Sequence, residues 1–429
     1  YSDNGNTVRF ASELKGVLAD PEQSRGLDHG QVHAYLAQGY PDPDRSVIAQ
    51  VHQVPPGAVV VIHRSGAMHK RWFTLQRPSR VKNPEEALEG FLALWPKILE
   101  EHGLSDVPLA VLQSGGIDSS LITAGMPTVS PPALVTAHFD SRDHDESDLA
   151  AAVARQSGSE HRIVTVEDRD AEILFRKIAW HVDGQLADSS AYALLQIVTA
   201  ARQQCTVALT GDGGDELFAG YPTVLATRIS RFASRVAPRG FLESLARFAL
   251  QRMARHDGRP SRWELVGRFA SGLSEPCPHS QWRRLLMAKD APSLYGPELR
   301  PLLGQNPLQT YDEAFFAARG SWSDKALLAD QLHYLPGDLL AKSDLMSMAV
   351  GLEIRVPFLD RRVVEFAANL DIGLLQPLGR SGKRLLRKVG ATYGLPDVVL
   401  RAPKRGFNVP VAQLLRGPWL PLARRYRID

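Results

Sequence analysis

The sequence has little of three things: long apolar runs, cysteine and net charge. No apolar stretch approaches the roughly 18 residues that a membrane-spanning helix needs, so no membrane partner is expected. The two cysteines, Cys205 and Cys277, are too few for a disulfide framework and suit a reducing compartment. The 50 Lys and Arg residues nearly balance the 47 Asp and Glu residues, for a net charge of +3, so no nucleic-acid partner is expected. Since the first residues also lack a signal-peptide pattern, we expect a cytoplasmic protein.

The chain of 429 residues has an ordinary globular composition and is long enough for two or three domains. Residues 1–75 are β-rich but hold too few strands for a core of their own, and they begin like the middle of a domain. We therefore expect this part to be the end of a larger layer, and the chain to be a fragment or a processed product. Residues 76–83 are polar, contain proline and predict a linker, and residues 84–429 form the main part.

Strand-like and helix-like segments alternate through the first half of the main part. Apolar strands are predicted at Val107–Leu112, Ala133–Phe139, His161–Val166 and Cys205–Leu209, with helical patterns between them. This alternation is typical of an α/β fold with a parallel sheet and helices on both faces. Ligands of such sheets bind beyond the carboxyl ends of the strands, so the loops after the strands should meet at one crevice. Residues 217–429 are predicted to be mainly helical.

The loop that follows the first of these strands reads SGGIDSS, residues 114–120. A strand that feeds a glycine-rich turn at the start of a helix offers unpaired backbone N–H groups to an anion. The carboxylate of Asp118 beside such a phosphate site is explained if Mg²⁺ bridges the two. The alternative is an ordinary strand-to-helix turn. The loop is not a Walker sequence, which requires G-x-x-x-x-G-K-[ST].

A second dense segment, TGDGGDELFAGY at residues 210–221, follows the CTVAL strand directly. Asp212, Asp215 and Glu216 place three carboxylates within five residues, and these repel one another unless a cation is present. A magnesium ion held by one or two carboxylates together with substrate phosphates accounts for the pattern. The alternatives are an exposed acidic turn and a helix cap formed by Asp215.

Two further segments place charges where chemistry could use them. Lys342, Asp344, Glu353 and Arg355 are embedded among apolar residues, so they should be paired or functional, and a structural ion-pair network is the alternative. The tract GKRLLRK at residues 382–388, with a lysine at 404, offers cations that could stabilise charge on a leaving phosphate, or else forms a basic helix face. The arginines between residues 228 and 268 are interpreted as the solvated face of amphipathic helices, with an acidic partner as the alternative.

Together these segments resemble the class B asparagine synthetase family, and the resemblance covers essentially the whole chain. The landmarks occur in the family's order: SDVPLAVLQSGGIDSS, ALTGDGGDELFAGY, YLPGDLLAKSDLMSMAVGLEIRVPFLD, SGKRLLRK and RAPKRGFNVP. Residues 1–75, with FASELKGVL and PPGAVVVI, resemble the end of the family's N-terminal glutaminase domain, which is of the Ntn type. The resemblance implies a parallel-sheet ATP pyrophosphatase-type domain, similar to the adenine nucleotide alpha hydrolases, with a helical C-terminal part.

The activity that the resemblance implies is ATP-dependent amidation of a small-molecule carboxylate through an acyl-adenylate, with release of AMP and pyrophosphate. The cofactors implied are ATP and Mg²⁺, and a homodimer is the candidate assembly. Carried over position by position, the pyrophosphate is held by Ser114, Gly115, Gly116, Asp118 and Ser119. The rest of the nucleotide site is Leu112, Val135, Gly211, Asp212 and Gly213. The metal ligands are Asp118 and Asp215, Glu353 accepts a proton from the attacking nitrogen, and Lys383 and Lys404 are phosphate-side lysines.

The sequence also departs from the family pattern. The N-terminal cysteine nucleophile of the glutaminase is not among these residues. This chain alone is therefore expected to use ammonia, whereas a longer parent protein is expected to use glutamine. In the acceptor-binding stretch, residues 183–191, an aspartate stands near the place of an arginine that anchors the substrate in the asparagine-making branch. Aspartate is the expected acceptor. The alternative is a specialised amidotransferase or a cyclase of the lasso-peptide or beta-lactam type.

Overall fold

The computed structural model describes most of the chain: residues 1–63, 66–78, 80–126, 131–141, 144–236, 238–251, 262–273, 275–377, 382–403, 406–407 and 409–426. Lys404, one of the two predicted phosphate-side lysines, lies outside the described residues. In the part of the chain that is described, no helix has both the length and the apolar character needed to cross a membrane.

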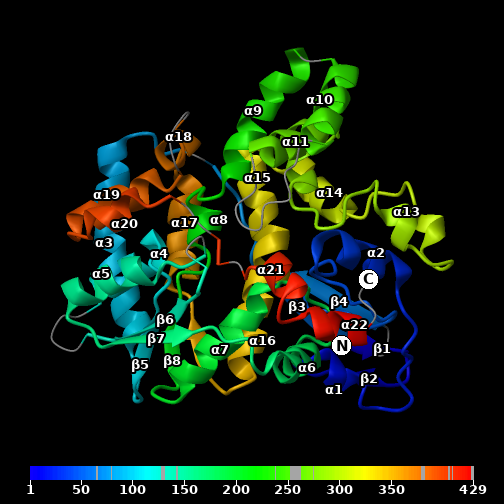
Figure 1. The fold of residues 1–429 in the computed structure, drawn as a ribbon, viewed down its shortest axis with the longest axis horizontal. Helices are drawn as coiled ribbons and strands as arrows, with labels where there is room; N and C mark the ends of the chain where they lie inside the picture. Colours follow the sequence, from blue (N-terminus) through cyan, green and yellow to red (C-terminus); the bar gives the residue numbers. More distant parts are fainter. Residues whose placement is uncertain are drawn as a thin grey trace.

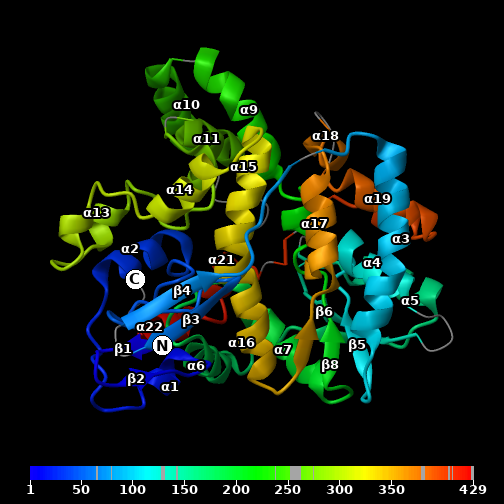
Figure 2. The same ribbon diagram turned by 180° about the vertical axis from the view of Figure 1, so that it is seen from behind.

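A five-stranded parallel sheet forms the centre of the main part (Figures 1 and 2). Its order is β7 (His161–Thr165), β6 (Ala133–His138), β5 (Leu109–Leu112), β8 (Val207–Leu209) and β9 (Glu353–Arg355). The first four strands are those predicted from the apolar runs, which confirms the α/β fold class. The fifth lies in the tract predicted to be mainly helical, where β9 joins the edge of β8 through bonds such as Glu353 N to Thr206 O, 2.9 Å.

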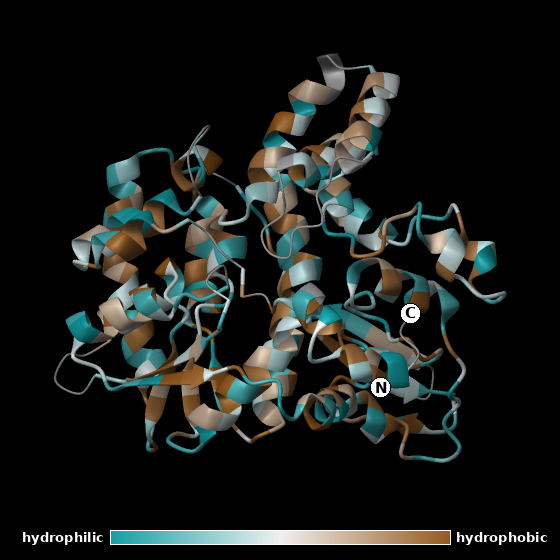
Figure 3. Cartoon of the chain, in the orientation of Figure 1, coloured by the Kyte–Doolittle hydropathy of each residue, from teal (hydrophilic) through white to brown (hydrophobic). Residues whose placement is uncertain are grey.

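Helices cover both faces of the sheet because successive residues of a strand point to opposite sides. Val111 and Leu209 pack into one core with residues of α3 (Pro84–Gly103), α4 (Ile117–Gly125) and α19 (Arg384–Thr392). Their neighbours Ala110 and Ala208 pack into a second core with residues of α7 (Ser190–Arg202) and α16 (Ala341–Met348). Helix α5 (Ser147–Ser157) packs against α4, and α6 (Ala171–Val182) packs against α7. Figure 3 shows brown, apolar segments where the strands run between these layers.

Helix α3 illustrates how local sequence sets an element. Asn83 precedes it and accepts hydrogen bonds from the backbone N–H groups of Glu85 and Glu86, at 2.8 and 3.3 Å, while Pro84 occupies the first turn. Further along, Phe91 and Trp95 are fully buried and stack with ring centroids 5.2 Å apart. The predicted cap and apolar face are both present.

The helical part that follows β8 begins with the short α8 (Gly214–Leu217) and then leaves the sheet. Helices α9 (Pro222–Val236), α10 (Arg239–Gln251) and α11 (Arg262–Leu273) form an arm that projects away from it in both ribbon views (Figures 1 and 2). The chain returns through α12 (Pro278–Gln281), α13 (Ala291–Leu294), the 3₁₀ turn η1 (Arg300–Leu302), α14 (Gln309–Ala317) and α15 (Trp322–Ala329). A π-helix, η2 (Asp330–Leu340), connects α15 to α16 and contains Pro336.

The two ends of the chain complete the molecule. The N-terminal part holds β1 (Ser2–Asp3), β2 (Val8–Arg9), α1 (Leu14–Val17), α2 (His29–Gln38) and a hairpin of β3 (Ala58–His63) and β4 (Gly66–Arg71). It is tied to the main part by Lys15, whose backbone N–H donates to Asp183 at 3.1 Å. The C-terminal elements are η3 (Pro357–Leu359), α17 (Arg361–Asn369), α18 (Ile372–Leu375), α20 (Asp397–Arg401), α21 (Val411–Arg416) and α22 (Leu420–Arg425).

Candidate active site

A cavity of about 550 Å³ lies beyond the carboxyl ends of β5, β6 and β8, at the place where the two glycine-rich loops meet. Most of the residues predicted from the sequence line it: Leu112, Ser114, Gly116, Asp118, Ser119, Val135, Gly211, Asp212, Gly213, Asp215 and Lys383. Loops that follow neighbouring parallel strands are brought to the same edge of the sheet, which is why two segments almost a hundred residues apart share one cavity.

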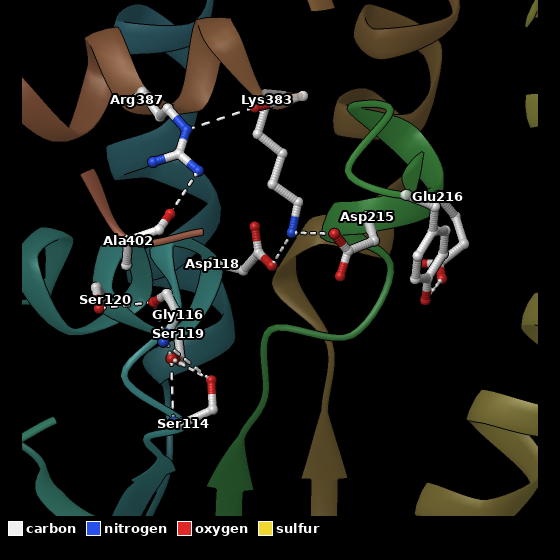
Figure 4. Close-up of polar contacts among 12 residues, drawn as sticks. Ser114, Gly116, Asp118, Ser119, Ser120, Asp215, Glu216, Lys383, Arg387 and Ala402 are labelled. Atoms are coloured by element: carbon white, nitrogen blue, oxygen red, sulfur yellow. Dashed lines mark hydrogen bonds and ion pairs between the residues drawn. The ribbon is translucent and has the colours of Figure 1, made fainter. Parts of the chain in front are cut away.

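The SGGIDSS loop is held in shape by its own hydroxyl groups. The Ser114 hydroxyl accepts from the backbone N–H of Gly116 at 3.2 Å, and the Ser119 hydroxyl accepts from the N–H of Ser114, also at 3.2 Å (Figure 4). Gly115 has a φ of +81°, and a Cβ added there would lie 2.8 Å from the carbonyl oxygen of Glu146. The loop therefore depends on glycine at this position, both for its backbone conformation and for its close packing.

Lys383 joins the two loops by bridging Asp118 and Asp215 (Figure 4). Its ammonium contacts the Asp118 carboxylate and lies 2.5 Å from an oxygen of Asp215, and the residue is only 4% exposed. The loops approach closely, since a Cβ on Gly211 would lie 2.8 Å from the Cβ of Asp118, and one on Gly220 would overlap Asp215. Two carboxylates that converge on one cation offer the hard oxygen ligands that suit Mg²⁺. Among the described residues, no cluster of three or more His, Cys, Asp or Glu side chains could hold a metal ion alone, so phosphate oxygens would have to complete the set.

The opposite wall of the cavity is built by the segment that was predicted to carry embedded charges. Lys342 is buried and pairs with Asp188 at 2.5 Å. Asp188 in turn accepts from both the backbone N–H and the hydroxyl of Ser190, each at 2.8 Å. Asp212, from the second loop, accepts from the hydroxyl of Ser343 at 2.7 Å. In the predicted acceptor stretch, residues 183–191, Asp188 is thus the aspartate that lines the cavity, and Lys342 neutralises it.

The π-helix η2 adds a carboxyl group behind this wall. Burial, and then the neighbouring Asp188 carboxylate, raise the pKa of Asp338 to about 7, although Lys342 acts in the opposite direction. Burial and the adjacent Asp215 likewise raise the pKa of Glu216 to about 7, and Glu216 accepts from the hydroxyl of Tyr221 at 2.5 Å. Both carboxyl groups therefore titrate near neutral pH.

The structure corrects the expectation that Glu353 faces this crevice. Strand β9 runs parallel to β8 with Glu353 opposite Val207, so Glu353 lies at the amino end of the sheet, away from the cavity. Its side chain is 58% exposed and pairs with Arg355 at 2.6 Å. Arg355 also donates to the carbonyl oxygens of His102 and Leu104, at 2.8 and 2.6 Å. These two residues form the structural ion pair that was the alternative interpretation.

Several cavity residues were not predicted as part of the nucleotide site. Arg387 lines the cavity and donates to the carbonyl oxygen of Ala402 at 3.0 Å. No pattern in the sequence favours it over the other cations of its helix. Tyr221 and Tyr334 also line the cavity, and the sequence offers no signal that these two rings come together. Gly406 and Phe407 line it as well; they directly follow Lys404 and Arg405, which lie outside the described residues.

A parallel sheet with a glycine-rich loop and converging carboxylates at its carboxyl edge defines a synthetase domain of the ATP pyrophosphatase type. Comparison with known families agrees: residues 97–427 match the asparagine synthase model, and residues 1–73 match a glutamine amidotransferase domain. The chain belongs to the asparagine synthase family, as the sequence motifs predicted.

Curated relatives match half of the chain or more in sequence. Asparagine synthetase [glutamine-hydrolyzing] 1 of Bacillus subtilis is 31% identical over 428 residues, which cover 97% of this chain and 64% of that protein. A putative asparagine synthetase [glutamine-hydrolyzing] of Mycobacterium tuberculosis is 27% identical over 413 residues, 91% of this chain and 59% of that protein. Amidase chyE of Penicillium rubens is 26% identical over 242 residues, 51% of this chain and 35% of that protein. The chain thus spans less than two thirds of the length of these relatives.

Proposed function

We propose that this chain is an ATP-dependent carbon–nitrogen ligase, which converts a carboxylate into an amide through an acyl-adenylate. The observation that carries the proposal is the convergence of Asp118 and Asp215 on Lys383, beside a glycine-rich loop at the carboxyl edge of a parallel sheet. This arrangement combines an anion-binding loop, two ligands for a divalent cation and a cationic side chain of the chain itself. Those are the parts that cleavage of ATP next to its α-phosphorus requires.

In the first step, a carboxylate oxygen of the acceptor attacks the α-phosphorus of ATP, and the bond to the β-phosphate oxygen breaks. The products are the acyl-adenylate and pyrophosphate. The hydroxyls and backbone of residues 114–119 would hold the leaving pyrophosphate, and Lys383 would turn from the carboxylates to neutralise its charge. Asp118 and Asp215 would hold Mg²⁺, which when bound neutralises phosphate charge.

In the second step, ammonia attacks the acyl carbon, the bond to AMP breaks, and the nitrogen loses a proton as the amide forms. Because Glu353 lies at the other end of the sheet, we assign the proton to Asp212, which lines the cavity and is oriented by the hydroxyl of Ser343. Removal of a general base typically costs on the order of 10²–10⁴-fold in rate. An Asp212→Asn variant should therefore form amide more slowly by about that factor.

The finer part of the proposal concerns the substrates. We propose aspartate as the acceptor, and glutamine or free ammonia as the nitrogen source, because the relatives that match most of the chain are named glutamine-hydrolysing asparagine synthetases. The glutamine amidotransferase match over residues 1–73 supports glutamine as the source in a longer parent protein. The second candidate is a specialised amidotransferase or cyclase. It is favoured by the pairing of Asp188 with Lys342 at the acceptor wall, because this lysine is already paired and is not a free cation that could anchor the acceptor.

Exchange of labelled pyrophosphate into ATP tests the proposal. We expect exchange that requires Mg²⁺ and aspartate, and asparagine formation when ammonium is added. Asp118→Asn and Asp215→Asn should abolish exchange. If no carboxylate supports exchange, the ligase proposal is refuted. If aspartate does not support exchange but a peptide or natural-product carboxylate does, the chain is a specialised amidotransferase or cyclase and not an asparagine-forming enzyme.

A further inference from the structure

An arginine whose side chain is only 11% exposed lies directly behind two aromatic residues of the cavity wall. The guanidinium carbon of Arg283 is 4.6 Å from the ring centroid of Tyr221 and 4.1 Å from that of Tyr334, so it contacts both rings. The rings themselves meet edge to face, with centroids 6.0 Å apart. Both tyrosines line the cavity, whereas Arg283 does not.

The arginine is fixed from its other side by Asp330, whose side chain is fully buried. The guanidinium donates from Nε to one carboxylate oxygen at 3.0 Å and from a terminal nitrogen to the other at 2.5 Å. Tyr311 donates its hydroxyl to the same carboxylate, and Nε2 of His279 lies 3.2 Å from it. Burial alone would raise the pKa of Asp330, but Arg283 and His279 outweigh it and hold this pKa below its ordinary value. Arg283 therefore sits in a charged and rigid setting.

The cluster is also connected to the loop that carries Asp215. Tyr221 donates its hydroxyl to Glu216 at 2.5 Å, and Gln331, the neighbour of Asp330, donates to the carbonyl oxygen of Glu216 at 2.7 Å. In Figure 4, Glu216 lies on the far side of Asp215 from Asp118 and the Ser114 loop. The aromatic wall therefore borders the half of the cavity that lies away from the phosphate-binding loop.

We infer that Arg283 is a positioning residue: it holds Tyr221 and Tyr334 as the wall against which the acceptor carboxylate is oriented. A planar guanidinium can lie against aromatic rings and still make a forked bond to a carboxylate, which the compact ammonium of lysine cannot do. Both rings contact this one group, and a small displacement of an orienting wall is costly in a reaction that needs aligned atoms. The inference rests on the proposed function, since it concerns the acceptor of that reaction.

The test separates positioning from folding by neutralising the buried pair as a unit. In the double variant Arg283→Gln/Asp330→Asn, both charges are removed, so no uncompensated charge stays buried. We expect this variant to retain cooperative melting and a wild-type Kd for ATP within about threefold. Its KM for the acceptor in pyrophosphate exchange should rise about tenfold or more, because the wall has lost its support. Arg283→Lys keeps the charge but not the planar group that contacts the two rings, and should raise the acceptor KM in the same way.

Arg284→Gln is the matched control, because Arg284 is the adjacent arginine and donates to Gln281 rather than to the aromatic wall. Its acceptor KM should equal that of the wild type. A double variant that melts at a lower temperature but keeps the wild-type acceptor KM would show that Arg283 is merely structural and would overturn the inference. Wild-type exchange is measured first: its absence refutes the proposed function, whereas normal wild-type exchange with an unchanged KM in the variants refutes only the role of Arg283.

Discussion

Replacing Lys383 by methionine removes the cation that joins the two loops of the site while keeping most of the side-chain volume. The carboxylate oxygens of Asp118 and Asp215 that contact one nitrogen can lie at most about 5 Å apart, so at an effective dielectric constant near 20 they would repel by about 3 kcal/mol. Their side chains are 14% and 10% exposed, and water relieves little of this repulsion. The figure agrees with the roughly 3–5 kcal/mol lost when one partner of a buried ion pair is removed. We therefore expect Lys383→Met to melt well below the wild type in metal-free buffer.

Magnesium provides the discriminating measurement. A divalent cation that takes the place of the ammonium should restore most of the lost stability, since a ligand at a hundred times its Kd contributes about 2.7 kcal/mol. Melting is followed by fluorescence with and without MgCl₂ for the wild type, Lys383→Met and Lys388→Met, the last removing a lysine from the same helix, α19. The wild type and Lys388→Met should respond weakly to Mg²⁺. If Mg²⁺ leaves the melting temperature of Lys383→Met unchanged, Asp118 and Asp215 do not form a cation site.

Three further predictions follow from single side chains. Glu353→Gln should change the rate of amide formation less than about threefold, because an exposed ion pair contributes little; a loss of about 10²-fold in kcat would return Glu353 to catalysis. Gly115→Ala should weaken ATP binding about tenfold or more in calorimetric titration, because its Cβ meets the carbonyl oxygen of Glu146 at 2.8 Å, and an unchanged Kd would contradict this reasoning. The pKa of Asp338 is raised from 3.8 to about 7, so the folded protein binds this proton more tightly than the unfolded chain does. Protonation of Asp338 therefore stabilises the fold fully below about pH 4, and this contribution is lost as the pH rises through 7. The melting temperature of Asp338→Asn relative to the wild type should therefore rise between pH 4.5 and about pH 7, and a difference that does not vary with pH would refute the assignment.

The two loops of the site could be predicted because their signals are local. Each consists of glycines and carboxylates placed directly after an apolar run, and the carboxyl ends of parallel strands share one edge of a sheet. Predicting that the two loops meet did not require the order of the strands in the sheet. The order found, with β5 between β6 and β8, only brings the loops closer together, so that Gly211 packs against Asp118.

The position of Glu353 could not be predicted, because it depends on the direction and register of a three-residue strand. A segment as short as β9 has no period that distinguishes it from the surrounding helices, and it forms only because the edge of β8 offers unpaired backbone groups. Once β9 pairs in parallel, its first residue must lie at the amino end of the sheet. The Arg283–Asp330 pair could not be predicted for another reason: its partners stand 47 residues apart, Arg283 in the turn after α12 and Asp330 at the start of η2, and the sequence does not orient these segments.

The charges of the cavity suggest how its ligands depend on one another. Lys383 pairs with both Asp118 and Asp215, and Lys342 pairs with Asp188, so two lysines offset most of the charge of three carboxylates before any ligand binds. A triphosphate that draws Lys383 away leaves two nearby carboxylates without their cation, at the cost of several kcal/mol derived above for Lys383→Met. A divalent cation that binds those carboxylates releases Lys383 for the phosphates. ATP thus frees the two carboxylates for Mg²⁺, and Mg²⁺ frees Lys383 for the phosphates of ATP. We expect ATP and Mg²⁺ to bind with positive cooperativity that disappears in Lys383→Met.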